Sequence, residues 1–110
     1  MNINIRKAEL SDFDTFIHLV CSLADYEMLP RPDSEAIERL RSHGFADNAR
    51  FDPWIAEYDG NPVGYAIIFE TYSSFLAKPT LYLEDLFLLP DYRKLGIGKR
   101  LFQKLAAEAK

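Results

Sequence analysis

The chain has 110 residues, of which 48% are hydrophobic, 14% aromatic and 27% charged, a composition typical of one globular domain that excludes a disordered segment. Its 17 acidic and 13 basic residues give a net charge of −4, so the chain lacks the basic excess that non-specific nucleic-acid binding needs. No apolar run approaches the ~20 residues that span a bilayer, no secretory signal is visible, and the lone Cys21 cannot form an internal disulfide, which together predict a cytoplasmic protein with no membrane partner.

The first residues predict a strand followed by a helix. Residues 2–6 alternate between polar and apolar side chains, which is typical of a short strand. Between residues 13 and 24 the large apolar side chains recur at helical spacing. Ser11 or Asp12 is expected to cap the start of this helix, because either side chain can accept a bond from a backbone N–H.

A second helix is expected after two prolines. Pro30 and Pro32 end the first helix, because proline has no backbone N–H and breaks helical bonding. The second helix is expected to be capped by Asp33 or Ser34 and to end near Gly44. Its inward-facing side chains are expected to be Ile37 and Leu40.

The middle of the chain predicts three strands joined by hairpins. Residues 54–58 are β-like, and the Asp59-Gly60 pair after them is a strong hairpin signal. The return strand is expected over residues 63–71, followed by a loop at residues 73–79. A third strand, dense in Leu, Tyr and Phe, is expected over residues 80–88, and a proline two residues later ends it.

The last segment predicts a basic helix that begins at Gly96 and Gly98. Residues 93–110 carry six basic side chains and one acidic one, a charge of +5, which leaves −9 on residues 1–92. This distribution predicts either an anion site or a solvated basic helix face. The apolar face of the helix is expected to consist of Ile97, Leu101, Leu105 and Ala109.

A strand, a turn and a helix follow one another over residues 81–104, and the turn reads R-x-x-G-x-G from Arg93 to Gly98. Glycines at a helix start let a ligand approach the backbone, whose first N–H groups have no partners within the helix. The turn therefore predicts a pyrophosphate site. Two other phosphate motifs do not fit, because Arg93 stands where a Walker A loop needs glycine and Leu101 where a dinucleotide fingerprint needs it.

These residues resemble the GCN5-related N-acetyltransferase (GNAT) superfamily, in which R/Q-x-x-G-x-G/A binds the pyrophosphate of acetyl-CoA. Residues 81–98, LYLEDLFLLPDYRKLGIG, further resemble its diamine (spermidine/spermine) and thialysine acetyltransferase branch. The resemblance implies that amides of the turn hold the pyrophosphate and that the preceding strand pairs with the pantetheine arm. The residues that it assigns to acetyl-CoA are Leu86, Phe87, Leu88, Arg93, Lys94, Leu95, Gly96, Ile97, Gly98 and Lys99.

The resemblance also implies an acceptor site. Glu84 would help to deprotonate the acceptor amine, through water, and Tyr26 and Glu27 would lie near the acceptor. The chemistry agrees, because an alkylamine is protonated at neutral pH and a carboxylate can attract the cation and relay its proton. Neighbouring residues of a strand face opposite sides. Asp85 is therefore expected to be a structural acid, solvent-facing or paired, that does not share the site of Glu84.

The expected fold is α/β, of the α+β type. It is the GNAT acyl-CoA N-acyltransferase fold, with a mostly antiparallel sheet flanked by helices in a single domain over residues 1–110. The resemblance implies later elements, among them one that carries the general acid, and these residues do not include them. The chain is therefore expected to form the N-terminal portion of the family fold, C-terminally truncated, with an apolar edge that recruits a second copy in a homodimer.

The expected activity is acetyl transfer from acetyl-CoA to a primary amine of a small molecule by direct attack. The alternative is a non-catalytic acyl-CoA-binding or regulatory fragment that needs a second chain. The acceptor is expected to be a diamine, polyamine, thialysine or similar amine. The loop at residues 73–78 lacks the acid that the polyamine branch carries, which weakens a polyamine assignment and leaves thialysine, another small amine or an amino-acid-like acceptor open. His18 and His43 lack metal-ligand spacing, and no metal is expected.

Overall fold

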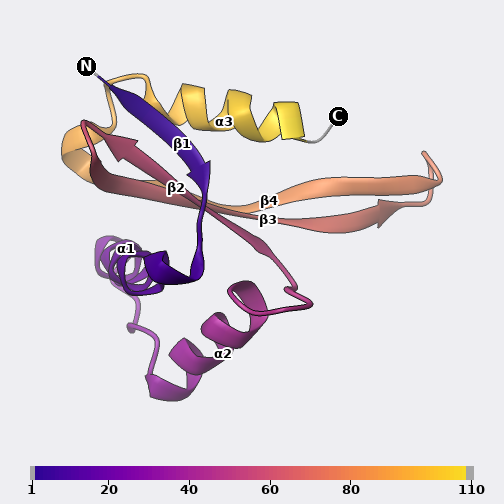
Figure 1. Cartoon of the computed structure of the whole chain (residues 1–110), viewed down its shortest axis with the longest axis horizontal. Coiled ribbons are helices and arrows are strands. Elements are labelled where there is room, and N and C mark those ends of the chain that lie inside the picture. Colours follow the sequence, from indigo (N-terminus) through magenta and orange to yellow (C-terminus); the bar gives the residue numbers. More distant parts are fainter. Residues whose placement is uncertain (1, 109–110) are drawn as a thin grey trace.

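Four antiparallel strands form the centre of the computed structural model, which describes residues 2–108 (Figure 1). They lie in the order β1–β2–β3–β4, which confirms the predicted antiparallel sheet with flanking helices. Short 3₁₀ turns at Leu10–Asp12 and Pro90–Tyr92 precede α1 and α3. The elements in chain order are β1 (Ile3–Lys7), α1 (Phe13–Tyr26), α2 (Ser34–Gly44), β2 (Asp52–Tyr58), β3 (Asn61–Ser73), β4 (Lys78–Leu88) and α3 (Ile97–Glu108).

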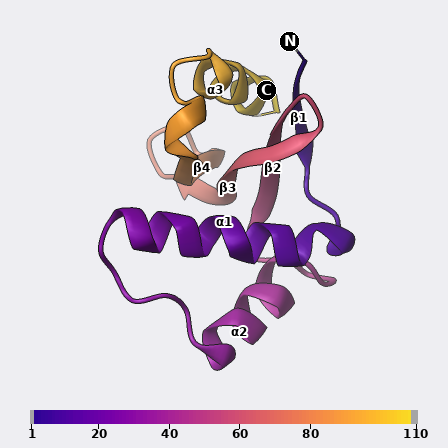
Figure 2. The same ribbon diagram turned by 90° about the vertical axis from the view of Figure 1, so that its left-hand side faces the viewer.

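The sheet carries helices on both faces, with α3 on one side and α1 and α2 on the other (Figures 1 and 2). Each face buries its own apolar cluster. Ile68 and Leu88 pack with Leu101 on the α3 face, whereas Phe16 packs with Tyr65 on the α1 face. Strand β3 therefore contributes to both clusters through alternating residues, as a strand covered on both faces does.

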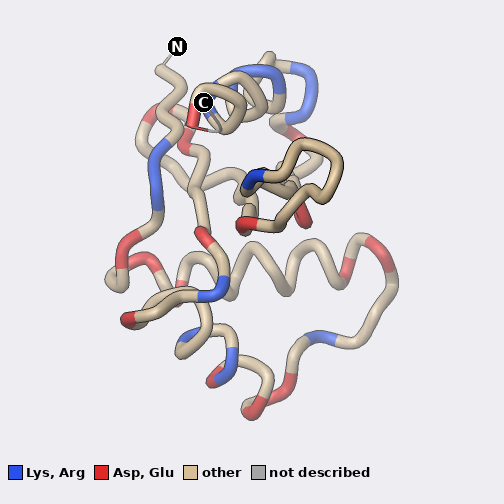
Figure 3. The backbone as a smooth tube through the Cα atoms, turned by 90° about the vertical axis from the view of Figure 1, so that its right-hand side faces the viewer, with Lys and Arg blue, Asp and Glu red and all other residues tan. Residues whose placement is uncertain are grey.

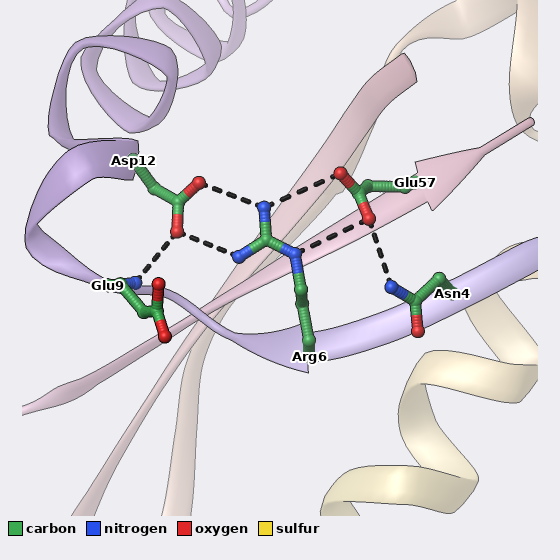
Figure 4. A network of polar contacts seen from close by, with 5 residues as sticks. All are labelled: Asn4, Arg6, Glu9, Asp12 and Glu57. Carbon is green, nitrogen blue, oxygen red and sulfur yellow. Dashed lines mark hydrogen bonds and ion pairs between the residues drawn. The ribbon is translucent and has the colours of Figure 1, made fainter. Parts of the chain in front are cut away.

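The start of α1 differs from the prediction. Asp12 occupies the N-cap position, but its side chain makes no cap bond to α1. Its carboxylate instead accepts from Arg6 Nη1 at 2.8 Å, from Arg6 Nη2 at 2.9 Å and from the backbone N–H of Glu9 at 2.7 Å. Arg6 also donates to Glu57 at 3.3 Å (Figure 4). The bidentate arginine bond competes with capping for the same oxygens and ties β1 to the turn before α1.

Helix α2 confirms the predicted cap. The Asp33 side chain accepts a bond from the backbone N–H of Ala36 at 2.8 Å, and Ile37 is half-buried. The helix ends at Gly44, as predicted, and packing requires a glycine at this position. A Cβ atom at Gly44 would lie 2.2 Å from the ring of Phe51, so only glycine lets this ring pack against the helix end.

The first predicted hairpin is confirmed, and the second is longer than predicted. Asp59 and Gly60 have φ angles of +50° and +83°, the left-handed pair that a tight hairpin turn requires. Strand β3 continues to Ser73, and β4 already begins at Lys78. Pro79 therefore lies within β4 and not in a loop. A proline is tolerated there because β4 is an edge strand. The paired strands extend beyond the helices as an arm (Figure 1).

Helix α3 buries the apolar face that the sequence predicts. Ile97 and Leu101 are fully buried, and Leu105 is nearly so. The fourth predicted member, Ala109, lies outside the described residues. None of the helices within residues 2–108 has the length and apolar character needed to cross a bilayer. The predictions of a cytoplasmic location and of a homodimer stay predictions.

Candidate active site

A bulge interrupts β4 at the predicted catalytic residue. Ile67 in β3 pairs with Asp85, but the next residue, Ile68, pairs with Leu83, so Glu84 is the extra residue in the ladder. An inserted residue breaks the alternation of side chains along the strand. Alternation therefore does not by itself place Glu84 and Asp85 on opposite sides here, and Asp85 lines the cavity described next whereas Glu84 does not. Glu84 is exposed and Asp85 is half-buried.

Asp85 lines a cavity on the α1 face of the sheet. The cavity has a volume of about 420 Å³ and lies between the end of α1, the loop after it and the sheet. Its polar groups are Glu27, Tyr65 and Asp85, and the Tyr65 hydroxyl donates to Asp85 Oδ2 at 3.3 Å. Asp85 is thus paired, as expected for a structural acid, but its partner places it in a cavity beside Glu27. The remaining wall is apolar and consists of Val20, Leu23, Ala24, Leu29, Pro30 and Pro32.

The two carboxylates of this cavity have no cation. Within residues 2–108, neither Glu27 nor Asp85 takes part in an ion pair. Both charges contribute to raising the pKa of the buried Tyr65, after burial itself, so both act on the same small volume. Figure 3 shows acidic residues where α1 ends and basic residues along α3. An apolar cavity with two unpaired carboxylates suits a ligand that has a cationic head and an alkyl body.

Arg93 and Tyr26 connect this cavity region to the turn before α3. The Arg93 guanidinium lies over the Tyr26 ring at 4.2 Å and over the Phe87 ring at 5.4 Å. Its Nε donates to the carbonyl oxygen of Leu88 at 2.9 Å. The Arg93 side chain therefore contacts the end of α1 and β4. The predicted anion site then depends on the backbone of the turn and on its other basic residues.

The turn has the backbone conformation that the motif predicts. Gly96 has a φ of +82°, which strains any other residue. The Arg100 N–H bonds to the Gly96 carbonyl at 3.1 Å, so the N–H groups of Ile97, Gly98 and Lys99 come before the first helical bond. Within residues 2–108 the backbone N–H groups that donate to side chains are those of Asn2, Glu9, Ala36 and Leu76, so no side chain caps the start of α3. A helix start with free N–H groups and exposed basic neighbours can hold an anionic group such as pyrophosphate.

The edge of β4 offers further backbone groups. The Leu89 N–H donates to the Val63 carbonyl at 2.8 Å across the Gly64–Leu88 pair, which makes this a non-hydrogen-bonded pair. The N–H and C=O of Leu88 and of Leu86 therefore point to the open edge, whereas those of Phe87 point into the sheet. The Leu88 carbonyl is the one that Arg93 occupies. An extended ligand could pair with the remaining groups as an added strand.

The open edge continues into an apolar groove on the α3 face. Leu81 is 36% exposed and Phe102 is 59% exposed, and both line this groove. Ile68, Leu83, Leu105 and Ala106 complete it. The predicted apolar edge is therefore present on β4, next to the start of the predicted cofactor strand.

Metal ligands are not grouped in the described part of the chain. Among residues 2–108, no group of three or more His, Cys, Asp or Glu side chains could hold a metal ion. His18 lies in α1 and His43 in α2.

Sequence reasoning missed Tyr65 and set Asp85 apart from the site. Tyr65 stands in an apolar run of β3, where the pattern predicts a core residue, and its ring is indeed fully buried. The signal that could have found it is the hydroxyl itself, because a fully buried tyrosine needs a hydrogen-bond partner. Asp85 is the nearest acid on the paired strand, but the bulge that turns it toward Tyr65 leaves no mark in the sequence.

The chain is similar in sequence to known proteins. A sequence model described as the Acetyltransferase (GNAT) family matches residues 16–110. Thialysine N-epsilon-acetyltransferase of Sus scrofa is 33% identical over 116 residues, and the match covers 98% of this chain and 68% of that protein. Spermidine/spermine N(1)-acetyltransferase-like protein 1 of Homo sapiens is 36% identical over 110 residues, covering 93% of this chain and 16% of that protein.

The fold is also found among solved structures. A predicted acetyltransferase with acetyl-CoA from Clostridium acetobutylicum superposes with a TM-score of 0.77 at 20% identity, over 98% of this chain and 73% of that one. The chain spans about two thirds of the length of the thialysine acetyltransferases that it matches.

Proposed function

The chain belongs to the acetyltransferase (GNAT) family of acetyl-transfer enzymes, and on that basis we propose that it carries an acetyl group from acetyl-CoA to the primary amine of a small molecule. The relatives named above act on amines, which supports the reaction class. The observation that carries the proposal is an apolar cavity lined by residues of α1 and β4, with two carboxylates that pair with no cation among residues 2–108. A protonated alkylamine would supply the missing cation.

The proposed cofactor site is the turn before α3 together with the edge of β4. The N–H groups of Ile97, Gly98 and Lys99 would hold the pyrophosphate, with added positive charge from Lys94. Leu95 and Gly96 shape the turn, and the backbone edge of Leu86 and Leu88 would pair with the pantetheine arm. Bound acetyl-CoA supplies the thioester carbonyl that the amine attacks.

The proposed acceptor site is the cavity at the end of α1. Glu27 and Asp85 would hold the ammonium group, and Tyr26 would form the wall between the acceptor and Arg93. Before attack, the ammonium must lose a proton, since its nitrogen has no free electron pair. Glu84, exposed at the bulge, would accept this proton through water. The amine nitrogen would then form the new bond to the acetyl carbon as the bond to sulfur breaks. The CoA sulfur would leave as a thiolate, and the proton that the nitrogen loses on forming the amide would pass to this thiolate.

Thiol release from acetyl-CoA tests this proposal. The full-length gene product would be incubated with short diamines, thialysine, spermidine and an amino acid with a side-chain amine, each at neutral pH. A matched quaternary ammonium compound, which has no transferable proton, serves as the control. Release with primary amines and none with the control supports the proposal. Absence of release with every amine, from a folded protein that binds acetyl-CoA, would overturn it.

One observation favours the alternative of an acyl-CoA-binding or regulatory fragment that needs a second chain. The apolar groove beside Leu81 and Phe102 is open along an edge strand, and such surfaces are usually covered. A second copy in a homodimer is the proposed cover. The alternative predicts acetyl-CoA binding by the 110-residue chain without turnover, and turnover once a second chain covers the groove.

A further inference from the structure

Tyr65 combines a fully buried ring with a hydroxyl that reaches the proposed acceptor cavity. The side chain has 0% exposure, and its ring contacts Phe16 edge-on at a centroid distance of 5.3 Å and Phe87 at 6.2 Å. The hydroxyl oxygen lies 3.3 Å from Asp85 Oδ2, and Tyr65 and Asp85 both line the cavity. One end of the side chain therefore belongs to the core and the other to the site.

The hydroxyl has no role in packing. The neighbours of the ring in its cluster are apolar, and a phenylalanine would make the same ring contacts. Burying a hydroxyl destabilises a fold unless it is hydrogen-bonded, so its presence here depends on Asp85. Burial, and then the neighbouring Asp85 charge, raise the pKa of Tyr65 far above neutrality. The group therefore stays protonated and acts as a donor.

Asp85 needs such a donor to face the cavity. Its carboxylate shares a largely apolar wall with Glu27, a like charge, so repulsion favours rotamers that turn away. The bulge at Glu84 also removes the regular ladder beside it. Within residues 2–108, the bond from Tyr65 is the one hydrogen bond of the Asp85 carboxylate, and it engages Oδ2. The bond fixes the rotamer and leaves Oδ1 for a ligand.

We propose that Tyr65 is a positioning residue of the acceptor site, whose hydroxyl holds the Asp85 carboxylate so that its other oxygen and Glu27 receive the substrate ammonium. This inference rests on the proposed function, because it assigns the cavity to the acceptor amine. Tyr65 itself does not touch the ammonium in this arrangement. Its effect reaches the substrate through Asp85 alone.

The variant Tyr65→Phe removes one oxygen atom and keeps the ring. For the full-length enzyme we expect the KM for the amine to rise about tenfold, the value of one hydrogen bond to a charged group. The kcat at saturating amine and the KM for acetyl-CoA should change less than twofold. Tyr82→Phe is the matched control, because Tyr82 lies on the same strand as Asp85 but is 52% exposed. Its kinetic constants should equal those of the wild type.

A double-mutant cycle with Asp85→Asn identifies the route of the effect. If Tyr65 acts through Asp85, the double variant has the same amine KM as Asp85→Asn alone, and independent multiplication of the two effects overturns the proposal. The midpoint of thermal unfolding is measured for all variants. A Tyr65→Phe variant with a lower midpoint of thermal unfolding but the wild-type KM for the amine also overturns the proposal.

Failure of this proposal and failure of the proposed function give different results. A wild-type enzyme that turns over amines, with an unchanged amine KM in Tyr65→Phe, removes the role of Tyr65 and leaves the function standing. A folded wild-type enzyme that acetylates no amine removes both.

Discussion

Two pairs of carboxylates in this fold differ in whether they share a cation of the chain. Asp12 and Glu57 come from separate elements and converge on Arg6, which bonds to both, and Asn4 completes the network (Figure 4). Glu27 and Asp85 also come from separate elements and converge on one cavity, but no cation of residues 2–108 pairs with them. The first pair is satisfied by Arg6, whereas Glu27 is exposed and Asp85 accepts a bond from Tyr65 alone among residues 2–108, which is why we propose that a ligand supplies their cation.

The same contrast holds for the helix starts. Asp33 caps α2 through the Ala36 N–H, whereas no side chain within residues 2–108 caps the first N–H groups of α3. Capped and paired groups stabilise the fold, and uncapped, unpaired groups mark where ligands are expected. Residue type alone therefore does not distinguish a structural acid from an acid that could bind a ligand. Asp12 and Glu57 share a cation of the chain, whereas Glu27 and Asp85 line one cavity and share none among residues 2–108.

The largest effect is expected at the bulge. Glu84→Gln keeps the size of the side chain but cannot accept a proton, so turnover should fall by roughly 10²–10⁴-fold, as for a general base, with acetyl-CoA binding little changed. Steady-state rates of the full-length enzyme measure this, and Glu70→Gln, also exposed and on the partner strand, is the control. A near wild-type rate of Glu84→Gln from pH 6 to pH 9 would demote Glu84 to a surface acid.

The next effect concerns the uncapped start of α3. A Cβ atom at Gly98 would lie 3.5 Å from Leu88 Cδ1, an ordinary contact, so the fold itself accepts alanine there. Gly98→Val should lower acetyl-CoA affinity by about tenfold or more, because its branched side chain blocks the approach of phosphate to charge-assisted N–H donors. Gly98→Ala is the control and should bind nearly as well as the wild type. Equal affinities of all three proteins in calorimetry would refute the anion site.

Much of the fold follows from the sequence, but the register does not. Apolar spacing predicts α1 and α3, and the Asp59-Gly60 pair predicts a hairpin, because these signals are local. The bulge at Glu84 and the in-strand Pro79 depend on how β3 and β4 align, which is a property of two strands together. The motif of the proposed anion site is contiguous and can be read from the sequence, whereas the proposed acceptor site depends on this alignment of strands.

The proposed acceptor site consists of residues from three parts of the fold. Glu27 was predicted from a resemblance, but Tyr65 and Asp85 meet only after the sheet has formed. Asp12 shows the same limit, because a residue expected to cap a helix bonds to an arginine six positions earlier. Local rules name the residue types correctly and miss their partners.

The smallest effect is expected at the satisfied acid pair. Arg6 lowers the pKa of both Asp12 and Glu57 below their ordinary values, so both acids stabilise the fold at neutral pH. A lowered pKa gives stability that is present above the ordinary carboxyl pKa and is lost as the pH falls through the folded value. Asp12→Asn should lower the free energy of unfolding by about 1 kcal/mol at pH 7, a value reduced for the partial exposure of Arg6.

Urea unfolding at pH 7 and at pH 3 checks this prediction. The difference in unfolding free energy between wild type and Asp12→Asn should shrink at pH 3, where the carboxyl groups of the unfolded chain become protonated. Asp25→Asn is the control, because Asp25 and Arg31 form an exposed ion pair whose loss should not be measurable. A difference between wild type and Asp12→Asn that is constant with pH would show that the pair does not act through its charge.

Calorimetric binding of n-butylamine and n-butanol to the enzyme saturated with CoA tests the central claim that the unpaired acids await an amine. Both ligands present the same alkyl chain, and at pH 7 the amine alone adds a cation. We expect the wild type to prefer the amine by at least about tenfold and a variant carrying both Glu27→Gln and Asp85→Asn to lose this preference. Equal binding of the two ligands to the wild type, or an unchanged preference in the variant, would contradict the claim.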